Sequence, residues 1–226
     1  MERNIIMRNV LLLLAGGISR RTKSSIPKQF VSVNSEPIFI HTIRKFEGFI
    51  NKCVIITHKN YIEFTKKEIQ KNIFPFETCV VEGGDTGLSS MIKGLNSLED
   101  EIIDLVFVHD ACRPFVDRET IENCSNVATK NGYAFSAAAL VESILDVSNN
   151  SVKTKDNLKR IMSPHCFKYD VLNKIVKDNQ KSKELTIFNL FVAQHYPIIV
   201  SDTYETNLKI TSENDLKNAI TLLSSK

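Results

Sequence analysis

Residues 10–17 read Val-Leu-Leu-Leu-Leu-Ala-Gly-Gly, an apolar run that ends in small residues. A short, continuous apolar run of this kind is typical of a strand buried on both faces of a parallel sheet. The run is too short to span a bilayer, and it leads into Arg20 and Arg21 instead of a small-residue cleavage site. We therefore predict a buried first strand followed by a loop with an accessible backbone.

Further apolar runs follow the first, and they alternate with segments of helical character. Candidate strands lie at residues 53–57, 78–81, 105–108, 134–140 and 197–200, and candidate helices lie at residues 38–46, 61–72, 89–98 and 119–130. In the last helix, Ile121, Cys124 and Val127 recur at the spacing of one buried stripe. Because strand and helix alternate, we expect right-handed crossovers and an α/β fold with a doubly wound, mostly parallel sheet.

The stretch from residue 142 to residue 159 is polar and strand-like. Residues 148–151 (Ser-Asn-Asn-Ser) form a turn sequence within it, so a long polar hairpin is predicted to stand out from the main sheet. We expect one domain over residues 1–226, with residues 140–165 as a protruding β-arm that serves dimerisation. A final helix should begin at Ser212, where Asp215 completes a capping-box pattern.

Composition excludes several classes of protein. The chain has 226 residues, of which 42% are hydrophobic and 24% charged, as in an ordinary globular protein. A formal charge of +3 gives no sign of the broad basic face that nucleic acid requires. The five cysteines are odd in number and form no CxxC pair, which argues against structural zinc and a disulfide framework and indicates a reducing cytoplasm.

The loop after the first strand is the first chemically informative segment. In an open α/β sheet, ligands bind beyond the carboxyl ends of the strands, and small residues there let backbone N–H groups approach phosphate oxygens. Arg21 and Lys28 would add the cations that nucleotidyl transfer requires. The loop matches neither a dinucleotide fingerprint nor a Walker loop. The alternative is a tight turn followed by a solvated basic stretch.

A second pair of glycines follows another predicted strand. Gly83, Gly84 and Asp85 precede Ser89 and Ser90, which open a predicted helix. A helix N-terminus with hydroxyl groups suits a polar ligand or an anion. Since both glycine pairs follow strands, we expect both loops to line one crevice. The alternative is that Ser89 simply caps the helix.

Asp110 and Arg113 follow the most apolar strand, and Lys209 lies on a predicted late strand. A carboxylate at that edge of the sheet could bind Mg²⁺ together with phosphates, and Arg113 could clamp a phosphate. An Asp–Arg ion pair that braces the loop is the alternative. His109 is interpreted as a structural histidine, because ionised phosphate nucleophiles need no base. Lys209 either reaches the same phosphates or is a solvated cation.

Taken in order, these segments resemble the cytidylyltransferase family that makes CDP-polyols. The motifs that carry the resemblance are LLAGG…R…PKQF, HTI..F, GGD…S, HDA.RPF and NLKIT..NDL, spread over nearly the whole chain. One branch of that family acts on methylerythritol 4-phosphate in isoprenoid synthesis, and another on ribitol 5-phosphate in cell-wall and capsule synthesis. The resemblance implies a Rossmann-like fold of nucleotidyltransferase type and a CTP-dependent, Mg²⁺-dependent enzyme that works as a homodimer.

The resemblance also implies roles for individual residues. It implies that the catalytic cations are Arg21, Lys28 and Lys209. It implies that CTP is bound by Ala15, Gly16, Gly17, Gly84, Asp85, Ser90 and Ala111, of which Ala111 contacts the ribose. It implies that the acceptor is bound by Asp110, Arg113, Ser143, Lys155 and Ser163, and that Asp110 also lies near the metal. Because the arm of that family crosses to a partner subunit, Lys155 and Ser163 are expected to complete a neighbouring site.

The chain departs from the family pattern mostly on the acceptor side. Ser19 and Gly87 replace a glycine and an arginine, Ile187-Phe188 replaces an acidic pair, and Met162-Ser163-Pro164-His165 replaces Gln-Thr-Pro-Gln. Leu-Ala-Gly-Gly at residues 14–17, together with the PKQF and HTI motifs, favours a ribitol 5-phosphate-like acceptor, with methylerythritol 4-phosphate as the alternative. A nucleotide-binding assembly protein without turnover is a further alternative. A dinucleotide oxidoreductase is disfavoured by the missing fingerprint.

Overall fold

A seven-stranded sheet forms the centre of the computed structural model, which describes residues 8–18, 26–99, 101–180 and 182–225. The strand order is β11-β7-β10-β6-β1-β4-β5. The strands are β1 (Asn9–Ala15), β4 (Lys52–Thr57), β5 (Glu77–Glu82), β6 (Leu105–Asp110), β7 (Tyr133–Ala139), β10 (Lys159–Lys168) and β11 (Val200–Asp202). Only β10 runs antiparallel to its neighbours in this sheet, so the predicted mostly parallel α/β fold is confirmed.

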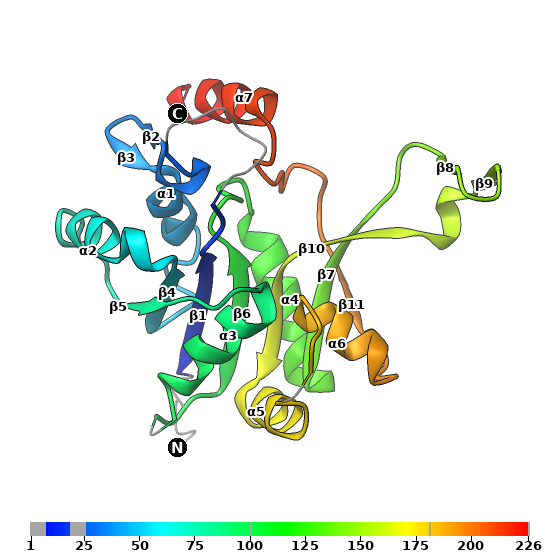
Figure 1. The fold of residues 1–226 in the computed structure, drawn as a ribbon, viewed down its shortest axis with the longest axis horizontal. Coiled ribbons are helices and arrows are strands. Elements are labelled where there is room, and N and C mark those ends of the chain that lie inside the picture. Colours follow the sequence, from blue (N-terminus) through cyan, green and yellow to red (C-terminus); the bar gives the residue numbers. More distant parts are fainter. Residues whose placement is uncertain (1–7, 19–25, 100, 181, 226) are drawn as a thin grey trace, which may run out of the picture.

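Helices cover both faces of the sheet (Figure 1). They are α1 (Ile38–Arg44), α2 (Ile62–Gln70), α3 (Gly87–Asn96), α4 (Arg118–Asn131), α5 (Tyr169–Asp178), α6 (Ile187–Ala193) and α7 (Glu213–Ser224), with short 3-10 turns η1 (Lys28–Phe30), η2 (Lys59–Tyr61) and η3 (Lys155–Asn157). In β1, Leu12 packs with α3, α5 and α6, whereas Leu11 and Leu13 pack with α1 and α4. Alternation along a strand sends successive leucines to opposite faces, which explains why the run is apolar throughout.

The hairpin predicted within residues 142–159 is present as β8 (Ile144–Asp146) paired with β9 (Ser151–Lys153). Figure 1 shows this hairpin standing well away from the central sheet, at the end of two long segments that continue from β7 and into β10. Its apolar side chains are exposed, with Val147 at 83% and Val152 at 65%. The hairpin therefore does not contribute to the core of its own chain.

Several boundaries differ from the predictions. The helix predicted from Ser89 begins at Gly87, because Thr86 is the capping residue and Ser89 completes its capping box. The strand predicted at residues 197–200 is displaced to β11, and Lys209 lies in an irregular segment, not on a strand. The capping box of Ser212 and Asp215 is confirmed.

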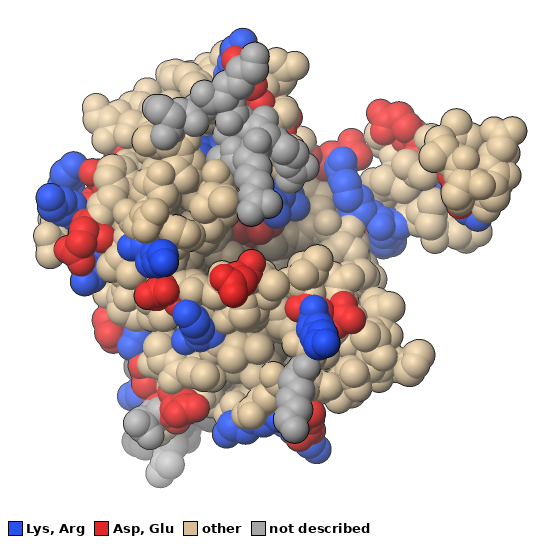
Figure 2. Space-filling model, viewed as in Figure 1, with Lys and Arg blue, Asp and Glu red and all other residues tan. Residues whose placement is uncertain are grey.

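Five strands and α-helices were not predicted: β10, α5, α6, β2 (Ser32–Val33) and β3 (Glu36–Pro37). β2 and β3 form a small antiparallel pair, and Val33 packs in one cluster with residues of α7. On the face shown in Figure 2, acidic and basic side chains are interspersed, and the arm projects beside them. No helix among the described residues is both long enough and apolar enough to cross a membrane.

Candidate active site

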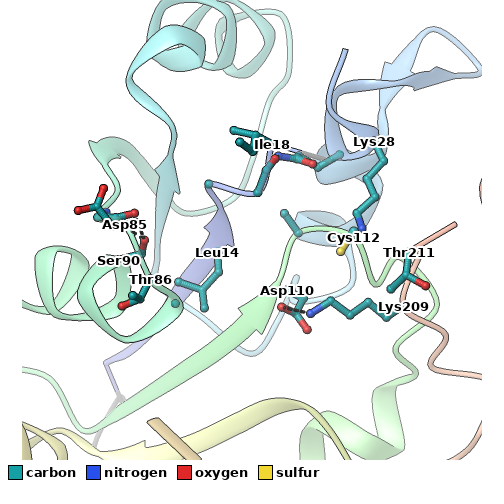
Figure 3. A pocket seen from close by; sticks show the side chains of 16 residues that line it. Leu14, Ile18, Lys28, Asp85, Thr86, Ser90, Asp110, Cys112, Lys209 and Thr211 are labelled. Carbon is teal, nitrogen blue, oxygen red and sulfur yellow. Dashed lines mark hydrogen bonds and ion pairs between the residues drawn. The ribbon is translucent and has the colours of Figure 1, made fainter. Parts of the chain in front are cut away.

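A cavity of about 450 Å³ lies at the carboxyl ends of β1, β5 and β6. The two glycine-bearing loops both reach it, as the sequence predicts. Its lining includes Gly16, Gly17, Ile18, Lys28, Gln29, Gly84, Asp85, Thr86, Ser90, Asp110, Ala111, Cys112, Lys209 and Thr211. Figure 3 shows Asp85, Thr86 and Ser90 on one side of this cavity and Lys28 and Lys209 on the other. We call it the donor cavity, after the CTP-binding role that the resemblance implies for several of its residues.

The loop after β1 is held in shape by Gln29, a residue of the PKQF motif for which the sequence predicts no role. Gln29 is buried in η1, and its Nε2 donates to the carbonyl oxygens of Ala15 and Gly17, both at 2.7 Å. These two hydrogen bonds fix the backbone of the loop. Within it, Ala15 is buried, and Gly16 and Gly17 line the cavity. The Pro-Lys-Gln motif therefore does two things: Lys28 lines the cavity and Gln29 clamps the loop.

The loop after β5 depends on glycine for a steric reason. A Cβ at Gly84 would lie 2.3 Å from the Ser89 Oγ atom, which no side chain tolerates. The Gly84 N–H donates to Ser90 Oγ at 3.0 Å, and that hydroxyl donates to the Gly84 carbonyl oxygen at 3.2 Å. Ser90 therefore fixes the loop of which Asp85 is part. The predicted site residues Gly84, Asp85 and Ser90 all line the donor cavity.

Gly87, where the family pattern has arginine, also has a local explanation. The start of α6 packs directly on the start of α3, and the Leu88 N–H donates to the Leu185 carbonyl oxygen at 2.9 Å. A Cβ at Gly87 would lie 3.2 Å from that same oxygen. The segment before α6 therefore lies so close to Gly87 that a side chain at this position would be crowded against it.

Asp110 is the charged centre of the site. It ends β6, and its Oδ1 accepts from Lys209 Nζ at 3.0 Å, while its Oδ2 accepts from Arg113 Nε at 3.0 Å and from Ser163 Oγ at 3.3 Å. Burial alone would raise the pKa of Asp110, but the two cations outweigh it and hold that pKa well below its usual range. The carboxylate is therefore ionised at neutral pH.

The contacts of Arg113 agree with the alternative in which an Asp–Arg ion pair braces the loop. Its side chain is only 9% exposed, and its Nη1 donates to the Asn207 carbonyl oxygen at 2.8 Å. Its guanidinium therefore binds Asp110 and the segment before α7, and Arg113 also lines the second cavity described below. Lys209, at 40% side-chain exposure, lines the cavity and can exchange its partner more readily.

A second cavity of about 340 Å³ lies against the first, and Leu14, Gly87, Asp110 and Lys209 line both. We call it the acceptor cavity, after the acceptor-binding role that the resemblance implies for Asp110, Arg113 and Ser163. Apart from Asp110, Arg113, Ser163, Thr186 and Lys209, much of its lining is apolar: Leu14, Met91, Val108, Ile161, Met162, Ile187 and Phe188. Phe188 is fixed by an edge-on contact with Phe135, with ring centroids 5.6 Å apart. The residues that replace the acidic pair therefore form an apolar wall.

Two histidines lie beside the acceptor cavity. Burial lowers the pKa of His109 to about 3 and that of His165 to about 4, so both imidazoles are neutral at pH 7. His109 Nε2 lies 3.2 Å from the Arg113 carbonyl oxygen and its ring packs on Phe46, as expected of a structural histidine. His165, which the sequence gave no reason to single out, stacks obliquely on Phe135.

The remaining predicted residues lie in three places. Arg21 lies outside the described residues, as does Ser19. Ser143 and Lys155 are on the exposed arm and line neither cavity of their own chain. Ser163 was expected to serve a neighbouring subunit, and this is corrected: β10 carries it back into its own sheet, where its hydroxyl accepts from the Asp110 N–H at 3.1 Å.

The side chains present fit a single-carboxylate site for a divalent cation. Among the described residues, no group of three or more His, Cys, Asp or Glu could hold a metal. Asp110 is ionised and faces both cavities. Mg²⁺ is commonly bound by one or two carboxylates and completed by substrate phosphates and water. Asp110 would hold the ion, provided that Lys209 gives up its contact with Oδ1.

Fold and site together define the class of protein: a nucleotidyltransferase with an open α/β sheet, glycine-bearing loops at one cavity and cations beside Asp110. Comparison with known proteins narrows the class. The model of the family described as 2-C-methyl-D-erythritol 4-phosphate cytidylyltransferase (IspD) matches residues 9–225. The chain belongs to this family of cytidylyltransferases.

Relatives and solved structures agree with this placement. The chain is 31% identical over 217 residues to a 2-C-methyl-D-erythritol 4-phosphate cytidylyltransferase of Leptospira borgpetersenii, covering 92% of this chain and 91% of the relative. It is 33% identical over 221 residues to the enzyme of that description in Thermosipho melanesiensis, covering 92% and 94%. The fold matches the 4-diphosphocytidyl-2C-methyl-D-erythritol synthase of Anaerococcus prevotii with a TM-score of 0.81 at 19% identity, covering 96% of this chain and 98% of that one.

Proposed function

We propose that this protein transfers the cytidylyl group of CTP to 2-C-methyl-D-erythritol 4-phosphate, releasing pyrophosphate, a reaction of isoprenoid synthesis. The relatives described above carry this activity in their names. The ribitol 5-phosphate-like acceptor, which three sequence segments favoured, finds no support among these relatives. The observation that carries the proposal is the pair of adjoining cavities that share Asp110 and Lys209.

In the proposed reaction, a phosphate oxygen of the acceptor attacks the α-phosphorus of CTP in line. The new P–O bond forms as the bond to the pyrophosphate oxygen breaks, and pyrophosphate leaves with that electron pair. A phosphate is already ionised at neutral pH, so no general base is needed. The neutral His109 and His165 agree with this, since neither is required to move a proton.

The donor cavity would receive CTP. The small residues Gly16 and Gly17 leave their backbone open to the triphosphate, and Lys28 and Lys209 lie across the cavity from the loop of Asp85. Cations placed where negative charge accumulates in the transition state lower the barrier to transfer. In this proposal Gly84, Asp85 and Ser90 contact cytosine and Ala111 the ribose. Arg21 would add a further cation.

The acceptor cavity would receive the polyol phosphate. Its phosphate would lie near Lys209 and Ser163, at the boundary between the two cavities. Its carbon skeleton would then face the apolar wall of Ile187 and Phe188. A C-methyl group gains free energy when such a wall removes it from water, whereas a hydroxyl group placed against the same wall loses its hydrogen bonds to water. This contrast favours methylerythritol phosphate over ribitol phosphate.

A divalent cation, for which we propose Mg²⁺, would be held by Asp110 and by phosphate oxygens. When bound, it would neutralise charge on the triphosphate and help to align it. Arg113 and Ser163 keep the Asp110 carboxylate oriented by binding its other oxygen. In that arrangement the protein's own residues position two anions, which is the main requirement of this chemistry.

We also propose that the protein is a homodimer in which the arm of one subunit completes the site of the other. Val147 and Val152 on the hairpin are exposed in one chain, and Ser143 and Lys155 line neither cavity of that chain. An exposed apolar hairpin is best accommodated by burial against a partner. Ser143 and Lys155 would then reach the acceptor of a neighbouring subunit.

The test is a panel of phosphate acceptors. Purified protein is incubated with CTP and Mg²⁺ and with 2-C-methyl-D-erythritol 4-phosphate, ribitol 5-phosphate or other sugar phosphates singly, and pyrophosphate is measured. Release with the methylerythritol compound is expected. Calorimetric binding of CTP without release from any acceptor would instead favour a nucleotide-binding assembly protein.

A further inference from the structure

The segment that links β11 to α7, residues 203–211, is irregular, and we call it the strap. It passes beside the carboxyl end of β6 and places Lys209 against Asp110 (Figure 3). An irregular segment has no helix or sheet ladder to define its position, so its register depends on individual contacts. The residue at its centre, Asn207, is fully buried.

Asn207 connects three other residues of the site. Its side-chain Nδ2 donates to the Ser163 backbone carbonyl oxygen at 2.6 Å, and its backbone carbonyl oxygen accepts from Arg113 Nη1 at 2.8 Å. Arg113 in turn binds Asp110, and the Asp110 N–H donates to Ser163 Oγ. These contacts close a ring that joins β6, β10 and the strap, and Lys209 follows two residues later.

Burying the side-chain amide of Asn207 costs free energy of folding, so packing alone does not explain an asparagine at this position. The Oδ1 atom of Asn207 is buried and has no hydrogen-bond partner among the described residues. An unmet buried acceptor costs about 1–3 kcal/mol, so an apolar side chain of the same size would serve packing better. The side-chain amide of Asn207 is explained by its Nδ2 group, which donates to Ser163 and so binds the strap to β10.

Other contacts hold the ends of the strap, and the exposed side chains of Tyr204 and Glu205 bond to Glu119 and Arg160, so Asn207 makes the buried contacts at its centre. At one end, the Thr203 N–H donates to the Ala137 carbonyl oxygen and its hydroxyl bonds to that of Thr120 at 2.9 Å. At the other, the Ile210 N–H donates to the Cys112 carbonyl oxygen at 2.9 Å. Thr203 therefore offers a matched contact on the same segment, outside the ring.

We propose that Asn207 is a positioning residue that holds Lys209 and Arg113 in register with Asp110 and Ser163. The kinetic consequence rests on the proposed function; the structural consequence does not. Displacement of a reacting group by about 1 Å can lower a rate by about 100-fold. Because Arg113 and Ser163 of the ring line only the acceptor cavity, whereas Asp110 and Lys209 line both, loss of the ring should raise KM for the acceptor more than KM for CTP.

The experiment compares Asn207→Leu, which is close in size, and Asn207→Ser, which is too short to reach Ser163, with the control Thr203→Val. Hydrogen–deuterium exchange of the full-length protein reports on the Asp110 and Ile210 amides. Both Asn207 variants should speed exchange there by about tenfold or more, and Thr203→Val should not. In steady-state assays, kcat/KM for 2-C-methyl-D-erythritol 4-phosphate should fall about 10- to 100-fold, with KM for CTP changed less than about threefold.

Each outcome is decisive. Unchanged exchange at Asp110 and Ile210 in either folded variant would overturn the proposal, as would equal loss for both substrates, which is expected of a merely structural residue. If wild-type protein turned over no acceptor, the proposed function would fail. Faster exchange in the Asn207 variants alone would still support the positioning role.

Discussion

The donor and acceptor cavities differ in how they are built. The donor cavity is lined by loop residues after β1, β5 and β6, with glycines and cations in its wall. The acceptor cavity is lined largely by apolar side chains from β10, α3 and the start of α6. The two share Asp110 and Lys209.

In our proposal, this difference would let one fold keep its donor and vary its acceptor. Backbone groups of the glycine loops would bind the triphosphate, so the donor half would depend on few side chains. The acceptor half depends on side chains such as Phe188, and, in our proposal, on Lys155 of a second subunit. Changes in one half should therefore leave the other intact.

Loss of a donor-side cation should have the largest effect. Lys28→Ala is expected to lower kcat by about 10²- to 10³-fold, because a preorganised charge at the triphosphate is removed. Steady-state pyrophosphate release measures it. Lys59→Ala, in η2 and absent from both cavity linings, is the control and should retain activity. Full turnover by Lys28→Ala protein would refute the donor-side mechanism.

The arm tests whether the acceptor half is shared between subunits. Lys155→Ala should lower kcat/KM for the acceptor by about tenfold or more through loss of a charge-assisted contact. Mixing Lys155→Ala and Lys28→Ala chains should restore activity, because one site in each hybrid dimer keeps both lysines.

After equal mixing and subunit exchange, about a quarter of all sites should be intact in a two-fold dimer. Activity of the mixture is compared with that of each variant alone at the same total protein concentration. A mixture no more active than the average of the two variants would argue against a shared site.

The apolar wall should show a smaller and more selective effect. Phe188→Ala is expected to raise KM for 2-C-methyl-D-erythritol 4-phosphate by about 5- to 20-fold, as a contact worth 1–2 kcal/mol is lost. The dissociation constant of CTP, measured by calorimetry, should not change. Val192→Ala, at an exposed position on the same helix, is the control. Equal weakening of CTP binding would contradict the separation of the two halves.

The smallest effect concerns pH and the buried His165. Its folded-state pKa of about 4 lies below the unfolded value, so the folded state binds fewer protons between those two values. The stabilising contribution is therefore present above about pH 6.5 and is lost as pH falls towards 4; by pH 5.5 it amounts to about 1 kcal/mol relative to pH 7.

Urea unfolding at pH 7 and pH 5.5 measures this loss. His165→Gln, which cannot titrate, should reduce the pH dependence by that amount. A His165→Gln variant that kept the wild-type pH dependence of unfolding would contradict the burial of a neutral imidazole at this position.

The sequence predicts the donor half well because its signals are local. An apolar run that ends in Gly16 and Gly17 reports both burial and an open loop, and Ser212 with Asp215 reports a cap. These properties depend on neighbours along the chain. The strands of the predicted βαβ units and their shared crevice follow from the same local patterns.

The acceptor half resisted prediction because its signals are not local. β10 mixes basic and apolar residues, since it leaves the arm and then crosses the centre of the sheet, and no period identifies it. Asn207 matters through contacts with residues 44 and 94 positions away. Ser163 was misplaced for the same reason, because its role depends on where β10 re-enters the sheet.

The most direct test of the account compares 2-C-methyl-D-erythritol 4-phosphate with erythritol 4-phosphate, which lacks the methyl group, at saturating CTP. One methyl group in an apolar pocket is worth about 10- to 200-fold in kcat/KM, so the methylated acceptor should be preferred by a factor in that range. Ribitol 5-phosphate should be a poorer acceptor than either. Equal values for the two erythritol phosphates, or a higher value for ribitol 5-phosphate, would contradict the account.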